Sequence, residues 1–415
     1  MEADLQKNPK KNTVPWTPAR LALFIGGLWL AVRLFTSLWA AVVSPLRPLT
    51  PVEIGVPLWP PGPGWPERVF LAPWQRWDAG WYVKIIDQGY RAGDGTAQFH
   101  PLYPWLATPL ARLGLPPMLA LLLVSSLSAL FFLIVFYRLA ALDLNESCAN
   151  TECARTATLL LALCPVSLVL FAPYTESLFL WLAALCLWWS RQHRWGLAGL
   201  AGGLAVLTRQ QGIFLLVPLL WEWWEASARS LPAARRNWRG LLGAALVPLG
   251  LLAWLFYRGI FLADVHPDFS SFHGMIYSVL ISPDASQVVT VQAFLWPWQA
   301  AWIALAQVFT DPGADLVTNW LIAVYFLVIL VWGWRGMRTS YRLYGVLIYW
   351  VSFSYHTGPT HPYMGLARHL LLAFPVFIGL GAVARRPWQR LVLVAVGVFG
   401  MAFALLEYVL EAWVL

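Results

Sequence analysis

The chain has 415 residues, of which 59% are hydrophobic and only 12% are charged. Soluble domains carry about twice that charged fraction, so the composition excludes a water-soluble protein. The 22 Phe, 27 Trp and 14 Tyr exclude a disordered chain, because they supply abundant apolar surface to bury. We therefore expect an all-α, polytopic integral membrane protein whose residues 1–415 form one domain.

Apolar segments recur along the chain and predict about 11 transmembrane helices, with a range of about 10 to 13. A helix needs roughly 17 to 25 apolar residues to cross a hydrocarbon layer about 30 Å thick. The segments that begin at residues 195 and 212 are short for full spans. The predicted spans are 21–43, 117–141, 156–172, 175–190, 195–208, 212–225, 240–262, 318–334, 341–357, 366–384 and 390–412.

Basic residues collect in alternate connections, which predicts the orientation because short cytoplasmic loops retain Lys and Arg. The tail before the first span is basic, and so are the connections around Arg138, Arg191, Arg235, Arg335 and Arg385. Residues 259–334 contain no Lys or Arg, but they contain five Asp. The N-terminus is therefore predicted to be cytoplasmic and the C-terminus extracytoplasmic. The net charge of +8 follows from this topology and requires no nucleic-acid partner.

Two long external segments, 44–116 and 263–317, separate the predicted spans. In the first, Trp74, Trp77, Trp81 and Ile85 recur at helical spacing, which predicts an interfacial helix with Asp78 on its aromatic face. Shielding from water makes a carboxylate a better proton acceptor, as a general base requires. The alternative is that Asp78 only caps the helix that follows.

Further polar side chains fall at the predicted external ends of the spans. His100 and Tyr103 lie beside Pro101 and Pro104, a pair of prolines that we expect to prevent a regular helix; the alternative function of this segment is a rigid turn. Tyr174 and Glu176 lie in a short external turn. For Glu176 the alternative to substrate binding is a favourable interaction with the helix dipole.

Two arginines lie where positive charge is rare. Arg209, followed by Gln210, requires an anionic partner, for which a phosphate is suitable because a guanidinium can bind two of its oxygens. The alternative is that Arg209 reaches the lipid headgroups. Arg368 lies near the external mouth of its span, after a polar turn that contains His361. Because no carboxylates flank that turn in the sequence, its histidines are poorly spaced for a metal.

Several of these motifs resemble the PIG-V-type mannosyltransferases and their prokaryotic relatives. In family order, they are Arg76-Trp77-Asp78-Ala79, Tyr82, Gly89-Tyr90, Phe99-His100-Pro101-Leu102-Tyr103-Pro104, Pro173-Tyr174-Thr175-Glu176-Ser177, Arg209 and Gly212. The segment from Arg368 to Pro375 is similar to one in bacterial enzymes of the GT-C class. The chain departs from the family at His100, where Phe is usual, and at Gln210-Gln211, where Ser-Asn is usual.

The resemblance implies a GT-C glycosyltransferase that takes a sugar, with mannose favoured, from a polyprenyl-phosphate donor outside the cytoplasm. We expect an inverting transfer to a lipid, glycan or protein acceptor, in a prokaryotic plasma membrane and among its lipids. Asp78 would be the base, and Arg209 and Arg368 would bind the donor phosphate. Substrate would be bound by Trp77, Tyr82, His100, Tyr103, Tyr174, Glu176, Gln210 and His361. We expect that no cofactor is required, although the sequence leaves a divalent metal open. The alternative function is a transporter or flippase of a lipid-linked sugar.

Overall fold

The computed structural model is almost entirely helical. It describes residues 18–46, 64, 71–144, 151–280, 293–311, 313–358 and 361–410. Five helices within these residues are long and apolar enough to cross a membrane: Pro18–Leu46, Pro117–Leu144, Arg239–Leu262, Ala314–Gly336 and Pro387–Val409. The expected all-α membrane fold is confirmed, whereas the count of eleven spans stays a prediction.

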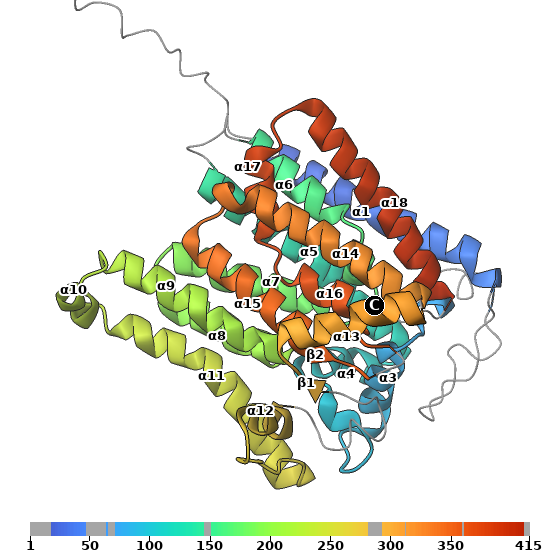
Figure 1. The fold of residues 1–415 in the computed structure, drawn as a ribbon, viewed down its shortest axis with the longest axis horizontal. Helices are drawn as coiled ribbons and strands as arrows, with labels where there is room; N and C mark the ends of the chain where they lie inside the picture. Colours follow the sequence, from blue (N-terminus) through green and yellow to red (C-terminus); the bar gives the residue numbers. More distant parts are fainter. Residues whose placement is uncertain are drawn as a thin grey trace, which may run out of the picture.

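Each predicted span coincides with helical structure in the bundle of Figure 1. Two of these spans are broken near prolines, at Pro165 and Pro375, because proline lacks the N–H that continues a helix. The helices are α1 (Pro18–Val43), α5 (Pro117–Leu144), α6 (Glu152–Ala162), α7 (Glu176–Arg191), α8 (Trp195–Val206), α9 (Leu216–Ala226), α11 (Arg239–Tyr257), α14 (Ala314–Gly333), α15 (Thr339–Ser354), α16 (Leu366–Leu371), α17 (Val376–Val383) and α18 (Pro387–Val409). Short elements join them: η4 (Ser167–Leu170), η5 (Gln210–Leu215), α10 (Leu231–Arg236), the π-helical η6 (Arg258–Leu262) and η8 (Trp334–Gly336).

The first external segment contains two short helices, α3 (Asp78–Gln88) and α4 (Leu102–Arg112). The 3-10 turns η1 (Ser44–Leu46), η2 (Ala72–Trp74) and η3 (Thr96–Gln98) accompany them. The expectation that Pro101 and Pro104 prevent a helix was wrong. Pro101 is the N-cap of α4 and Pro104 lies in its first turn, where a missing N–H costs no hydrogen bond.

The second external segment also contains regular structure that the sequence did not predict. It holds α12 (Phe272–Leu280), β1 (Ala293–Phe294) and α13 (Pro297–Thr310). Strand β1 pairs antiparallel with β2 (Tyr355–His356), with Ala293 opposite His356. This pairing ties the segment to the end of α15, immediately before the turn that leads to α16.

One continuous hydrophobic core extends from α1 to α18. Helices α8 and α11 approach so closely that a Cβ atom at Gly199 would lie 1.7 Å from the carbonyl oxygen of Gly243. Small residues at a crossing let two backbones touch, and this is how membrane helices gain packing energy when lipid is as apolar as the protein. Helices α1 and α18 lie side by side, and Trp39 Nε1 donates to Ala402 O at 2.8 Å.

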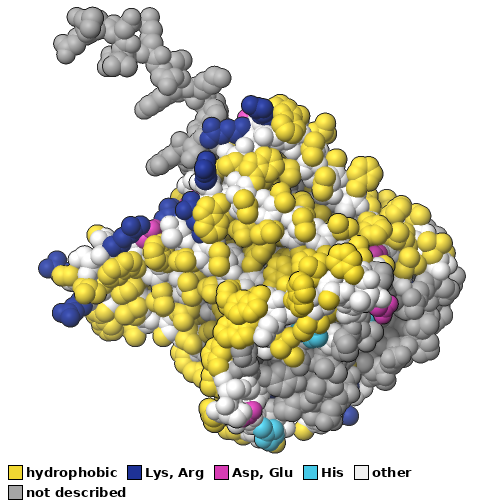
Figure 2. Space-filling model, viewed as in Figure 1, with side chains coloured by type: hydrophobic (Ala, Val, Ile, Leu, Met, Phe, Trp, Pro, Cys, Tyr) yellow, Lys and Arg dark blue, Asp and Glu magenta, His cyan; other side chains and the backbone are white. Residues whose placement is uncertain are grey.

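The two ends of the bundle differ in charge. Figure 2 shows dark blue Lys and Arg side chains along the end that carries α10 and the turn between α17 and α18. His side chains and several acidic side chains appear toward the other end, near α12, β1 and α13. The connections that the sequence identifies as basic are thus brought to one end.

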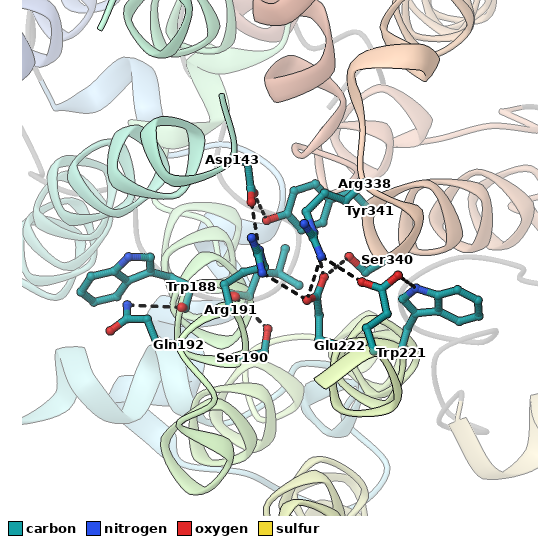
Figure 3. A network of polar contacts seen from close by, with 12 residues as sticks. Asp143, Trp188, Ser190, Arg191, Gln192, Trp221, Glu222, Arg338, Ser340 and Tyr341 are labelled. Carbon is teal, nitrogen blue, oxygen red and sulfur yellow. Dashed lines mark hydrogen bonds and ion pairs between the residues drawn. The ribbon is translucent and has the colours of Figure 1, made fainter. Parts of the chain in front are cut away.

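A polar network joins four helices at this basic end (Figure 3). Arg191 Nε of α7 lies 2.9 Å from Asp143 Oδ1 of α5, and Arg191 Nη1 lies 3.6 Å from Glu222 Oε2 of α9. Arg338, at the start of α15, lies 3.2 Å from Glu222, and Tyr341 donates to Asp143. Asp143 and Glu222 are almost completely buried. The network therefore fixes the relative positions of α5, α7, α9 and α15.

Glu222→Ala should destabilise the protein by about 3 kcal/mol, because breaking a buried ion pair leaves its arginine partners undercompensated. The matched control is Arg229→Ala, which breaks an i,i+4 pair with Glu225 in which the arginine is 61% exposed. This control should cost less than about 1 kcal/mol. Unfolding in detergent measures both variants, and equal losses would contradict a special contribution from the network.

Candidate active site

Four charged side chains form a continuous series of ion pairs at the end of the bundle opposite the network. Arg368 Nη1 donates to Asp78 Oδ2 at 2.5 Å, and Arg368 Nε lies 3.7 Å from Glu176 Oε1. Arg209 Nη1 donates to the same Glu176 oxygen at 2.5 Å. We call Asp78, Arg368, Glu176 and Arg209 the charge chain. Its members are far apart in the sequence, so the tertiary fold brings them together.

Asp78 is the first residue of α3, and 22% of its side chain is exposed. Trp77 precedes it with φ 54° and ψ −126°, a backbone conformation that residues other than glycine rarely adopt. The predicted helix across Trp74 was wrong, because the chain turns at Trp77 and α3 begins only at Asp78. Trp77 holds the N-cap position, and the carboxylate of Asp78 pairs with Arg368 instead.

Glu176 is fully buried at the start of α7, between the two guanidinium groups. A buried carboxylate is costly unless it is paired, and here one oxygen faces two arginines. Thr175 Oγ1 accepts a further bond from Arg209 Nη1 at 2.9 Å. The ring of Tyr174 lies 5.3 Å from the guanidinium carbon of Arg368, a cation–π contact. The Tyr174-Thr175-Glu176 motif thus contacts both arginines.

Arg209 lies in the turn between α8 and η5, with extended backbone at φ −154°. Gly212 lets η5 fold directly against α8, because a Cβ atom there would lie 2.5 Å from the nitrogen of Val206. This close return brings the Arg209 guanidinium to the N-terminus of α7. Arg368 is placed by α16, where Asn319 Oδ1 accepts from the nitrogen of Ala367 at 3.2 Å.

Tyr82 lies within electrostatic range of all four members of the charge chain. It packs edge-on against Tyr103, with 5.0 Å between ring centroids. Burial, reinforced by the negative charge of Asp78, raises the pKa of Tyr82 well above its usual range. The phenol is therefore a neutral hydrogen-bonding group at physiological pH.

The remaining predicted residues have other partners or are partly exposed. Tyr103 is fully buried, and its hydroxyl contacts Leu121 O and Ser125 Oγ of α5 at 3.0 and 2.7 Å. His361 Nδ1 lies 2.7 Å from Asp315 Oδ2. Trp77 and Gln210 are half-buried. The structure thus gathers Asp78, Tyr82, Tyr174, Glu176, Arg209 and Arg368, and it pairs His361 with the start of α14.

His100 is held neutral by its surroundings. Its Nδ1 lies 2.6 Å from Val206 O, so this nitrogen carries the proton because a carbonyl can only accept. Burial lowers the pKa of His100 to about 3, and the charges of Arg258 and Arg209 act in the same direction. His100 therefore stays uncharged across the physiological range.

Two features of this end were not predicted from the sequence. Arg258 and Asp264 form a buried ion pair, with 2.8 Å between Nη2 and Oδ2. Arg258 is the last basic residue before the stretch free of Lys and Arg. Like Arg209, it is a positive charge near the external end of a predicted span, where positive charge is rare, and this feature could have identified it. His369 is buried next to Arg368, within electrostatic range of Arg209. Among the described residues, no group of three or more His, Cys, Asp or Glu could hold a metal.

Comparison with known families agrees with these motifs. The family model described as Mannosyltransferase (PIG-V) matches residues 64–216. The resemblance to PIG-V mannosyltransferases is confirmed. This PIG-V segment contains Asp78, Glu176 and Arg209, whereas Arg368 lies beyond it. No curated protein matches the chain.

The fold is similar to that of ArnT from Cupriavidus metallidurans. The structure of ArnT bound to undecaprenyl phosphate aligns with a TM-score of 0.50 and 13% identity, over 87% of this chain and 60% of ArnT. Apo ArnT aligns with a TM-score of 0.50 and 15% identity, over 86% and 59%. The chain thus spans about 60% of the length of ArnT. At this identity the likeness concerns the fold alone.

His100→Phe should make stability less sensitive to acid. The folded protein keeps His100 neutral down to a pKa of about 3, whereas an unfolded histidine takes up a proton below about pH 6.5. The stability that His100 contributes is therefore fully present above pH 6.5 and is lost as the pH falls toward 3. Between pH 7 and pH 5, the wild type should lose about 2 kcal/mol more than the variant.

Thermal unfolding in detergent across this pH range tests the assignment. The lost bond to Val206 lowers the stability of His100→Phe at every pH, so only the change with pH is informative. Parallel curves for the two proteins would show that His100 is not held neutral.

Proposed function

We propose that this protein is an inverting membrane glycosyltransferase that moves a sugar, mannose by family resemblance, from a polyprenyl-phosphate donor to an acceptor hydroxyl. The charge chain carries the proposal, because it pairs a partly exposed carboxylate with one arginine and links that arginine through the buried Glu176 to a second one. The PIG-V segment and the ArnT-like fold support the same reaction class. The acceptor would be a lipid, a glycan or a protein.

In this reaction Asp78 takes the proton from the acceptor hydroxyl as its oxygen bonds to the anomeric carbon of the sugar. The bond between that carbon and the donor phosphate oxygen breaks, and the polyprenyl phosphate leaves with the electron pair. A single displacement inverts the anomeric centre. Arg209 and Arg368 stabilise the charge that grows on the phosphate. No oxidation state changes, so the reaction requires no redox cofactor.

Each arginine of the charge chain faces a carboxylate. The donor phosphate must therefore compete with Glu176 and Asp78 for the guanidinium groups. When Arg368 turns to the phosphate it releases Asp78, and the base becomes free once the donor is bound. The fully buried Glu176 remains between the arginines and limits how far they separate.

We further propose that the charge chain faces the extracytoplasmic side and that the N-terminus is cytoplasmic. The gathering of Lys and Arg at the opposite end supports this orientation (Figure 2).

The polar groups also favour an enzyme over a flippase, because a flippase should need polar access from both faces. At the basic end the carboxylates of the network are buried and paired with arginines, whereas at the other end Asp78 is partly exposed.

Asp78→Asn tests the base directly. Loss of a positioned base should reduce turnover about 10² to 10⁴-fold with a polyprenyl-phosphate-mannose donor. Donor affinity should be retained or increased, because the neutral amide of the variant no longer competes with the phosphate for Arg368. Single-turnover transfer and donor binding are measured on the same preparation. Near wild-type turnover would remove Asp78 from this role, and loss of both transfer and binding would point to misfolding.

Arg209→Ala tests the phosphate contact. An ionic hydrogen bond contributes about 1.5 to 3 kcal/mol, so the donor Kd should rise roughly 10-fold to 100-fold. Arg112→Ala is the matched control, because it removes an exposed positive charge from α4 at the same end of the bundle. Donor binding that is equal in the two variants would reject the role of Arg209.

A further inference from the structure

The connection between α9 and α11, taken together with the first residue of α11 (residues 227–239), projects from the bundle at the end opposite the charge chain (Figure 1, around α10). We call it the basic hairpin. It carries four exposed arginines, and residues 226–263 contain no Asp or Glu. Figure 2 shows dark blue side chains at the tip of this projection, next to apolar ones. The four arginines are Arg229, Arg235, Arg236 and Arg239.

Internal hydrogen bonds hold the basic hairpin in shape. Trp223 Nε1 donates to Asn237 O at 2.9 Å, and Asn237 Nδ2 donates to Ser227 Oγ at 3.3 Å. Ala228 and Arg229 both have positive φ, near 50°, which closes the turn after α9. The arginines are therefore presented on a preformed scaffold.

The nearby carboxylates are already used by the network of Figure 3. Glu222 pairs with Arg191 and Arg338, while Glu225 pairs with Arg338 and with Arg229. Within the described part of the chain, Arg235, Arg236 and Arg239 form no ion pair. Their three positive charges lie within five positions of one another and require anions from outside the protein.

Apolar side chains accompany these arginines. Leu231 is 66% exposed and Trp238 is 52% exposed, and both lie within the basic hairpin. Trp and Leu beside Arg are typical of segments that lie in a membrane interface next to negatively charged headgroups. Water alone would solvate the arginines, but it would not favour exposure of Leu231 and Trp238.

We propose that the basic hairpin binds the headgroups of anionic phospholipids in the leaflet at this end of the bundle. The guanidinium groups of Arg235, Arg236 and Arg239 would contact the phosphates, while Leu231 and Trp238 enter the boundary with the acyl chains. This interaction is independent of the transfer reaction, so either proposal can fail without the other.

Native mass spectrometry of the full chain in detergent tests this interaction, with phosphatidylglycerol and phosphatidylcholine as probes. The wild type should bind phosphatidylglycerol more tightly. Each arginine near an anionic surface is worth roughly a fivefold change in affinity, so Arg235→Gln/Arg236→Gln should weaken phosphatidylglycerol binding about tenfold or more. Binding of phosphatidylcholine should not change. Arg235→Lys/Arg236→Lys should keep most of the preference, because it keeps the charge.

Arg335→Gln/Arg386→Gln is the charge-matched control, since it removes two exposed arginines from the same end but outside the basic hairpin. This control should keep the preference for phosphatidylglycerol. Equal losses in the two Gln pairs would assign the effect to the general charge of this end and overturn the proposal. A wild type without preference, or an Arg235→Gln/Arg236→Gln variant that binds like wild type, would overturn it as well.

Discussion

The buried carboxylate of Glu176 is the constraint on which the candidate site depends. Its oxygen faces guanidinium groups from two different parts of the fold, at 2.5 and 3.7 Å. Neither arginine could lie so deep in an apolar bundle without a negative partner, because desolvation of an unpaired charge is costly. Glu176 thus fixes α7 relative to α16 and to the turn after α8, and through Arg368 it fixes the position of Asp78.

Carboxylates at the two ends of the bundle lead to different outcomes. At the basic end, Asp143 and Glu222 engage Arg191, Arg338 and Tyr341, and both carboxylates are almost completely buried. At the other end, the series of pairs stops at Asp78, which is 22% exposed. The first arrangement stabilises packing, and the second leaves a carboxylate partly exposed, as the proposed base requires.

The sequence predicted most of the fold, because hydropathy and basic loops report directly on membrane helices. It missed α13, which is short, begins at Pro297 and contains Gln299 and Gln307. It also predicted that Asp78, Glu176, Arg209 and Arg368 lie on the same face of the membrane bundle, because hydropathy and basic loops also locate the ends of the spans. It could not predict that Glu176 bridges the two arginines, or that Trp77 turns the chain just before Asp78. Such contacts depend on how helices rotate and pack, and periodicity does not encode that.

The pairing within the charge chain also determines the order of events that the proposed reaction requires. Two arginines without partners would attract any anion at the membrane surface, whereas two paired arginines select a ligand able to displace a carboxylate. A phosphate offers several oxygens to the planar guanidinium fork, so it competes better than an isolated carboxylate. Asp78 is the more exposed of the two acids, and its bond to Arg368 opens at lower cost than the buried contact of Glu176. Donor binding would therefore free the base while leaving the arginines anchored, which links proton abstraction to the presence of a leaving group.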